Sequence, residues 1–102
     1  MDVTKITPDF EDERGFITDI LCQEPIDYVT IITSKKGALR GNHVHEETVQ
    51  YVYVMEGKLK ALSQMPDEPV CTTVLEAGDL IVNVPNEGHA FEALEDTTFL
   101  VL

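Results

Sequence analysis

The chain contains three histidines, and two of them, His43 and His45, are separated by a single residue. Side chains alternate along a β-strand, so on an extended segment both imidazoles point to the same face. Two neighbouring imidazoles can chelate a cation such as zinc, iron, nickel or copper. An imidazole also titrates near neutrality, which suits it to abstract and return a proton. Most such pairs are exposed residues without a specific function, so the surrounding sequence must show whether this pair forms a site.

The residues around this pair follow a longer pattern that begins and ends at a glycine. It runs Gly37, five residues, His43, one residue, His45, four residues, Gln50, six residues and Gly57. This pattern resembles the first sequence motif of the cupin family, in which a glutamate usually stands where this chain has Gln50.

A second pattern further along the chain resembles the other cupin motif. Gly78, Pro85 and His89 follow one another in its order, with one residue more before the proline and one fewer after it. The two resemblances together imply an all-β cupin-type fold, which is a double-stranded β-helix or jelly-roll barrel. They also imply a divalent transition metal inside the barrel. Its ligands would be His43, His45, His89 and Gln50, and its identity stays open among zinc, iron, manganese, nickel and copper.

Gln50 is the departure from the motif that bears most on the chemistry. An amide oxygen can coordinate a cation but carries no charge, so three imidazoles and an amide leave the full charge of the ion in place. We expect such a centre to polarise bound water or a substrate oxygen more strongly than a centre with a carboxylate ligand. The alternative is that Gln50 only forms hydrogen bonds within the pocket.

Two further segments are similar to the dTDP-4-dehydrorhamnose 3,5-epimerases and the dTDP-sugar 3,4-ketoisomerases. They are residues 10–16, FEDERGF, and residues 39–43, LRGNH. Those enzymes generally move protons beside a sugar carbonyl without a metal. The resemblance implies that His43 or His45 is the catalytic acid/base and that Arg40 steadies charge on the substrate.

Some residues do not follow this second resemblance. Residues 29–33, VTIIT, lack the tyrosines that ketoisomerases tend to carry there. The cations that could meet a pyrophosphate are limited to Arg14, Lys35, Lys36 and Arg40. For the two arginines, ion pairing with the many carboxylates is the structural alternative.

The elements that must position these residues read as short strands. Segments rich in β-branched and aromatic residues are separated by Gly, Pro and Asn turns, and no stretch keeps a 3.6-residue period. Within 48–55, Gln50, Val52 and Val54 share one face, and Tyr51 and Tyr53 on the other are expected to pack or to form an interface. We expect strands at 16–22, 26–33, 48–55, 58–65, 70–75, 80–84, 89–94 and 97–102. Residues 1–15 are expected to be an N-terminal arm whose acidic run, 9–15, is a solvated loop, and 1–102 a single barrel or sandwich domain.

The charge composition of the chain limits the classes of partner that it can bind. Seven Lys and Arg against 19 Asp and Glu give a formal net charge of -12, which opposes binding to nucleic acid or to an anionic membrane. The first residues do not resemble an export signal and no apolar run reaches membrane-spanning length, so we expect a cytoplasmic protein. Cys22 and Cys71 are expected to be reduced and buried. Edge strands on so short a barrel predict a homodimer.

These observations favour a metal-binding cupin that acts as an enzyme on a small, oxygen-rich sugar or keto compound. Isomerisation, epimerisation and oxygenation all remain open as its reaction. One alternative is a metal-independent nucleotide-sugar epimerase or ketoisomerase that uses His43 or His45. Another is a barrel that binds a small ligand without catalysis, because a fold alone does not choose between these roles.

Overall fold

The computed structural model describes residues 3–44 and 49–102, with residues 42–44 described by their backbone only. Within these ranges the regular structure is entirely β, and no helix occurs that is long and apolar enough to cross a membrane. The strands are β1 (Val3–Lys5), β2 (Phe10–Asp12), β3 (Gly15–Ile17), β4 (Thr30–Ser34), β5 (Leu39–Val44), β6 (Gln50–Glu56), β7 (Lys58–Gln64), β8 (Cys71–Glu76), β9 (Asp79–Asn83), β10 (Gly88–Ala93) and β11 (Thr97–Val101).

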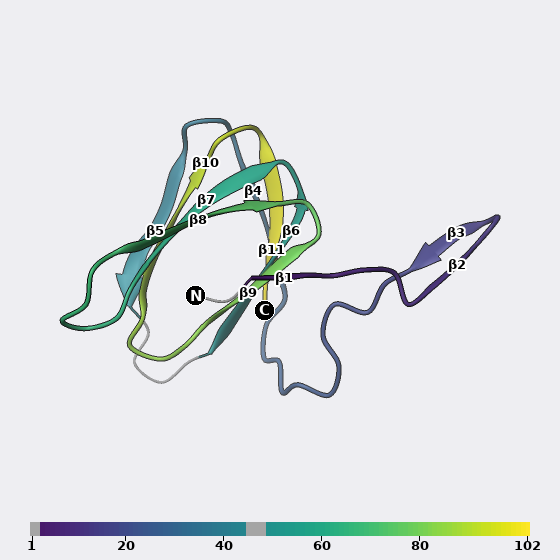
Figure 1. The fold of residues 1–102 in the computed structure, drawn as a ribbon, viewed down its shortest axis with the longest axis horizontal. Helices are drawn as coiled ribbons and strands as arrows, with labels where there is room; N and C mark the ends of the chain where they lie inside the picture. The colour runs from purple at the N-terminus through teal and green to yellow at the C-terminus, as the bar shows by residue number, and fades with distance from the viewer. Residues whose placement is uncertain (1–2, 45–48) are drawn as a thin grey trace.

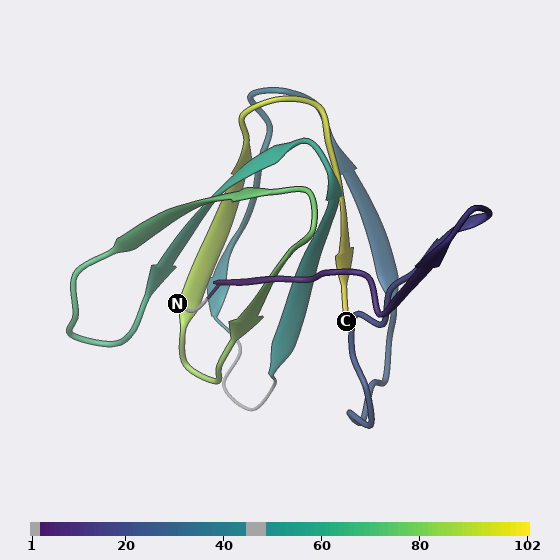
Figure 2. The same ribbon diagram turned by 45° about the vertical axis from the view of Figure 1, so that its right-hand side comes forward.

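The described strands form two large antiparallel sheets and a small hairpin. One sheet has the order β1-β9-β6-β11-β4 and the other has the order β5-β10-β7-β8. The two sheets face each other, as Figures 1 and 2 show, and strands distant in sequence are neighbours within them. The hairpin β2–β3 extends away from the sheets in both views, and its residues are exposed apart from half-buried Asp12. The architecture is a jelly roll, as the sequence predicts.

The core lies between the two sheets and follows from alternation along the strands. On β6, Val52 and Val54 are fully buried while Tyr51 and Tyr53 on the opposite face are half-buried. This confirms the face assignment made from the sequence, because every second residue of a half-buried strand faces the core. The core cluster consists of the buried apolar residues Val52, Val54, Leu59, Ala61, Leu75, Ile81, Phe91, Ala93 and Phe99.

All six strands predicted from residue 48 onward are confirmed within the described residues, with bounds that differ by one or two residues. The expected strand 16–22 is wrong beyond Ile17, and the expected strand 26–33 begins only at Thr30. The segment between them, 18–29, is rich in apolar residues but pairs with no strand of the described chain, and Gln23 within it has a φ of 58°. The acidic run 9–15 is not a simple loop, since β2 and the start of β3 lie within it.

Both cysteines are free, as expected, but neither is buried. Cys22 lies in the irregular segment before β4, and Cys71 begins β8, the edge strand of the four-stranded sheet. An edge strand has a neighbouring strand along one of its two edges only, so an apolar run in it does not imply burial.

Candidate functional site

Polar side chains replace apolar ones at one end of the space between the sheets. On β6 the inward series ends in Gln50, and on β9 it ends in Asn83, directly opposite Gln50 in the register of the two strands. On β10 and β7 the same end carries His89 and Ser63, which also face each other in register. The turn of residues 84–87 joins β9 to β10, so all four lie at the same end of the barrel. We name Gln50, Asn83, Ser63 and His89 the inner polar cluster.

The inner polar cluster is largely shielded from solvent. Ser63, Asn83 and His89 are buried, and Gln50 is half-buried. One step deeper along each strand the inward residue is apolar, and the His89 imidazole contacts the ring of Phe91 with centroids 5.7 Å apart. A ligand that reaches this end would therefore meet hydrogen-bonding groups above an apolar floor, the usual make-up of a small-molecule pocket.

The backbone of His43 lies directly opposite that of His89 in the β5–β10 ladder. The register shifts between His89 and Ala90, so that Ala90 faces Gly41 rather than Asn42, as in a β-bulge. Gly41 has a φ of 89°, and a Cβ there would lie 3.1 Å from the carbonyl oxygen of His89. Glycine therefore permits the close approach of the two strands beside these histidines. The side chain of His43 and all of His45 lie outside the described residues.

Arg40 joins the two sheets below this point. Its Nε donates to Ser34 Oγ at 2.7 Å and its Nη2 donates to the carbonyl oxygen of Thr33 at 3.0 Å. Ser34 and Thr33 belong to β4 in the five-stranded sheet, whereas Arg40 belongs to β5 in the other sheet. The guanidinium thus holds the two free edges together in this structure. Its expected contact with substrate stays a prediction.

Arg14 has the structural role that the sequence left open. It lies in the turn of the β2–β3 hairpin, and its Nη2 is 2.6 Å from Asp12 Oδ2. The guanidinium and the Arg14 backbone N–H hold the pKa of the Asp12 carboxyl below its ordinary value.

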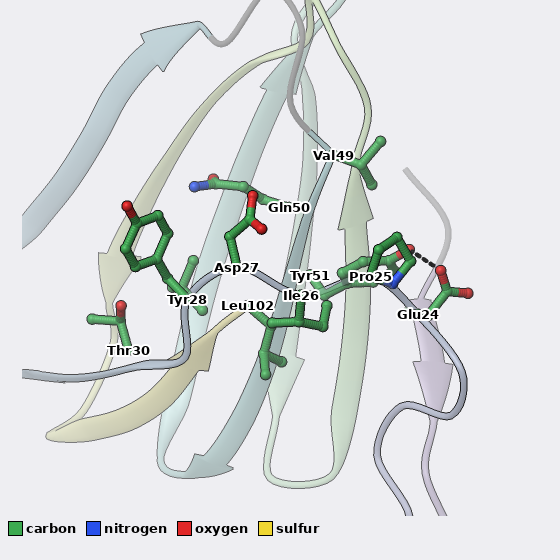
Figure 3. A pocket seen from close by; sticks show the side chains of 11 residues that line it. Glu24, Pro25, Ile26, Asp27, Tyr28, Thr30, Val49, Gln50, Tyr51 and Leu102 are labelled. Carbon is green, nitrogen blue, oxygen red and sulfur yellow. Dashed lines mark hydrogen bonds between the residues drawn. The ribbon is translucent and has the colours of Figure 1, made fainter.

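A pocket of about 730 Å³ opens beside Gln50 at the same end (Figure 3). Its other wall is the irregular segment before β4, which contributes Asp27 and Tyr28. The hydroxyl of Tyr51 donates to Glu24 Oε2 at 3.2 Å across this wall. Burial raises the pKa of Tyr51, and the hydrogen bond and charge of Glu24 raise it further. The described lining residues are Glu24, Pro25, Ile26, Asp27, Tyr28, Thr30, Val49, Gln50, Tyr51, Val101 and Leu102, which include carboxylates, phenols and an amide but no lysine or arginine.

The donor set predicted for a metal is partly described. His89 and Gln50 both lie at the polar end of the barrel, and an imidazole nitrogen and an amide oxygen are suitable ligands for a transition metal. Within the part of the chain that the structure describes, no three His, Cys, Asp or Glu side chains come together as a metal site. The remaining predicted ligands, His43 and His45, are those without described side chains, so the metal centre stays a prediction.

Sequence reasoning missed Asn83, Ser63, Asp27 and Tyr28. The available signal for Asn83 was a polar residue at an inward position of the apolar run 80–84, LIVNV. Ser63 follows Leu59 and Ala61 at alternating positions in the same way. Asp27 and Tyr28 carry no such signal, because they lie in a segment without periodicity.

Comparison with known proteins agrees with this geometry. The family model described as Cupin domain matches residues 30–102. No curated protein sequence matches the chain. Solved structures do match it over nearly its whole length, and three examples follow.

The first is a sugar 3,4-ketoisomerase from Thermoanaerobacterium thermosaccharolyticum in complex with TDP. It is 23% identical with a TM-score of 0.82, over 99% of this chain and 77% of that one. The second is a dTDP-4-dehydrorhamnose 3,5-epimerase from Sulfolobus tokodaii, 21% identical with a TM-score of 0.77, over 95% of this chain and 64% of that one. The third is a 3'-monoepimerase from Streptomyces bikiniensis in complex with dTDP-quinovose, 20% identical with a TM-score of 0.82, over 98% and 61%. At these identities the likeness shows the shared fold, and the chain spans less than two thirds of each epimerase.

Proposed function

Because the chain belongs to the cupin domain family, we propose that it is an isomerase or epimerase. Its substrate would be a nucleotide-linked keto sugar, and it would move a proton beside the carbonyl group without using a metal. The observation that carries this proposal is the buried imidazole of His89 at the polar end of the barrel, with the backbone of His43 directly opposite. The fold shared with a sugar ketoisomerase and two sugar epimerases supports it.

The proposed reaction needs a base, a way to stabilise negative charge and a proton donor. His43 or His45 would take the proton from the carbon next to the carbonyl, as a neutral imidazole can near pH 7. The electron pair of the broken C–H bond would form a C=C bond, and the carbonyl oxygen would become an enediolate oxygen. If the hydroxyl on the deprotonated carbon passes its proton to this oxygen and the former carbonyl carbon receives the abstracted proton, the product is an isomer whose carbonyl has moved by one carbon. Return of the proton to the opposite face of the deprotonated carbon gives an epimer. Polar groups at a partly dry end of the barrel would stabilise the anionic oxygen more effectively than water does.

The competing proposal is the metal centre predicted from the sequence. A cation bound by His43, His45, His89 and Gln50 would supply the charge that stabilises the enediolate oxygen. The two proposals differ in one measurable respect, which is whether activity survives removal of divalent ions.

The experiment is proton exchange in heavy water. The purified protein is incubated with TDP-4-keto-6-deoxyglucose, and deuterium incorporation beside the carbonyl is followed by NMR, with and without chelator. We expect exchange that persists with chelator and that falls about 10²–10⁴-fold in His43→Asn or His45→Asn, the usual contribution of a general base. Lys60→Gln is the matched control, because Lys60 alternates with buried Leu59 and Ala61 and lies on the outer face of β7.

The possible outcomes separate the proposals. Exchange that the chelator abolishes and that zinc or manganese restores would establish the metal centre instead. Binding of the sugar nucleotide with no exchange above background would leave a non-catalytic ligand-binding barrel. Equal exchange in the two histidine variants and in the control would remove both histidines from the mechanism.

A further inference from the structure

The side chain of Asn83 is buried and finds no hydrogen-bond partner in the part of the chain that the structure describes. Asn83 is 2% exposed, and among the described residues no group bonds to either its Oδ1 or its Nδ2. A buried polar group without a partner destabilises a fold, and native proteins contain few of them. Such a group therefore requires an explanation, and a functional role in binding is one of the established ones.

The position of Asn83 suggests what it binds. It ends the inward series of β9 after Ile81, which belongs to the core, and it lies opposite Gln50 in the β6–β9 register. Opposed residues on one face of an antiparallel pair have Cβ atoms about 5 Å apart. Gln50 lines the 730 Å³ pocket, and Asn83 is its neighbour on the adjacent strand.

A second buried polar atom occurs at the other end of the β9–β10 turn. Glu87 is 7% exposed, and its Oε1 also has no partner in the described part of the chain. Unsatisfied groups at both ends of one turn, beside the inner polar cluster, indicate that this end of the barrel is arranged to face a polar ligand.

We propose that the Asn83 carboxamide binds the sugar ring of the substrate, through a hydroxyl or a neighbouring hydroxyl and carbonyl. This rests on the proposed function and assigns the uncharged, hydroxyl-bearing part of the substrate to this end of the barrel. The amide presents an unfilled acceptor and an unfilled donor together. A cation would satisfy only its oxygen and a phosphate only its nitrogen, whereas a sugar hydroxyl both donates and accepts. The described pocket lining also offers no lysine or arginine to a phosphate.

The test compares Asn83→Leu with Thr97→Val. Leucine has a similar volume and no polar atoms, so Asn83→Leu should leave the thermal unfolding midpoint unchanged or raise it. Thr97 is buried at the opposite end of the barrel, but its Oγ1 has partners, the carbonyl oxygens of Lys58 and Glu95 and the backbone N–H of Lys58. Thr97→Val should therefore lower the midpoint by about 4–8 °C.

The binding measurement uses dTDP-quinovose, dTDP and free quinovose as probes, by calorimetry for the nucleotides and by NMR for the free sugar. Asn83→Leu should lower the affinity for dTDP-quinovose by about tenfold or more and abolish the NMR signal of quinovose binding. The affinity for dTDP should stay unchanged. Thr97→Val should leave all three affinities at the wild-type values. Asn83→Asp, which keeps the shape and loses the donor, should weaken the two sugar ligands as well.

Three results would overturn the proposal. One is a midpoint for Asn83→Leu that falls as far as that of Thr97→Val, which would mean a structural role. Another is an unchanged affinity for dTDP-quinovose, which would mean that Asn83 holds only a water molecule. The third is a wild-type protein that binds neither sugar probe. Failure of the proposed function is a different result, because it shows as sugar binding that Asn83→Leu weakens, with no deuterium exchange in the wild type.

Discussion

Adding one methyl group at Gly41 tests whether the close approach of β5 and β10 positions the site. Gly41→Ala would place a Cβ 3.1 Å from the carbonyl oxygen of His89 and 3.3 Å from the Cα of Ala90, and both contacts are with backbone. Gly37→Ala is a matched control. Gly37 has a φ of 90° against 89° at Gly41, but no described atom lies within 4 Å of its Cβ position.

The two substitutions share one penalty and differ in the other. A left-handed backbone conformation destabilises alanine by about 1–2 kcal/mol relative to glycine, and this applies to both positions. Only Gly41→Ala must also move backbone by a few tenths of an ångström, and overpacking of this kind typically costs about 1–3 kcal/mol. We therefore expect Gly41→Ala to lower the free energy of unfolding by about 2–5 kcal/mol and Gly37→Ala by about 1–2 kcal/mol.

The site should respond to the same difference. The backbone that must move belongs to His89, the residue opposite His43 in the ladder. Misplacement of a reacting group by about 1 Å can lower a rate by about 10²-fold, so deuterium exchange should fall in Gly41→Ala and persist in Gly37→Ala. Urea unfolding gives the stabilities, and exchange is measured under conditions where both variants are folded. Equal losses of stability and of exchange in the two variants would refute the reasoning, since the conformational penalty alone would then explain both.

Three further predictions follow from contacts described above. The pKa of Asp12, measured by NMR titration, should rise toward 3.8 in Arg14→Gln. The wild-type ion pair stabilises the hairpin above pH 3.8 and loses this effect as the pH falls through the lower folded-state pKa. An unchanged pKa in Arg14→Gln would show that the pair does not persist in solution. The pKa of Tyr51 should fall in Glu24→Gln but stay above 10.0, because burial is the larger cause of its rise. The stability that this raised pKa contributes is present below pH 10.0 and is lost as the pH rises through the folded-state pKa. Tyrosinate absorbance against pH in both proteins measures the difference, and an unchanged pKa in Glu24→Gln would contradict the assignment to Glu24. We expect light scattering at micromolar concentration to give the mass of two chains. Phe16 is 66% exposed in the hairpin, and Phe16→Ser should shift the measured mass toward that of one chain. A monomeric wild-type protein would contradict the predicted dimer.

The sequence was sufficient where alternation is long and uninterrupted. Val52 and Val54 on β6 and Leu59 and Ala61 on β7 are apolar at every second position, and all four are buried. Three-residue strands such as β1 and β2 are too short to show a period, so their existence depends on pairing that the sequence does not display. Segment 18–29 shows the converse, because apolar content predicts a strand only where another strand is available to pair with it.

The site was predicted in part for a related reason. His89 and Gln50 were found through their spacing in motifs, and the structure places both at the polar end of the barrel. Asn83 and Ser63 carry no motif, and a polar residue within a strand ordinarily indicates the solvent face. Their alternation with the inward residues of the same strands was the one available signal, and their burial in the structure shows that both face inward.

The sheet order also determines when this fold can form during synthesis. β11, the last strand, lies between β6 and β4 in the five-stranded sheet and pairs with both. Until residues 97–101 leave the ribosome, the edges of β4 and β6 that pair with β11 have no partner. A ribosome adds about 5–20 residues per second, so the nascent chain must keep two incomplete edges from aggregating for seconds. We therefore expect folding to be completed only after translation of β11, and slowly, because the pairings join residues far apart in sequence.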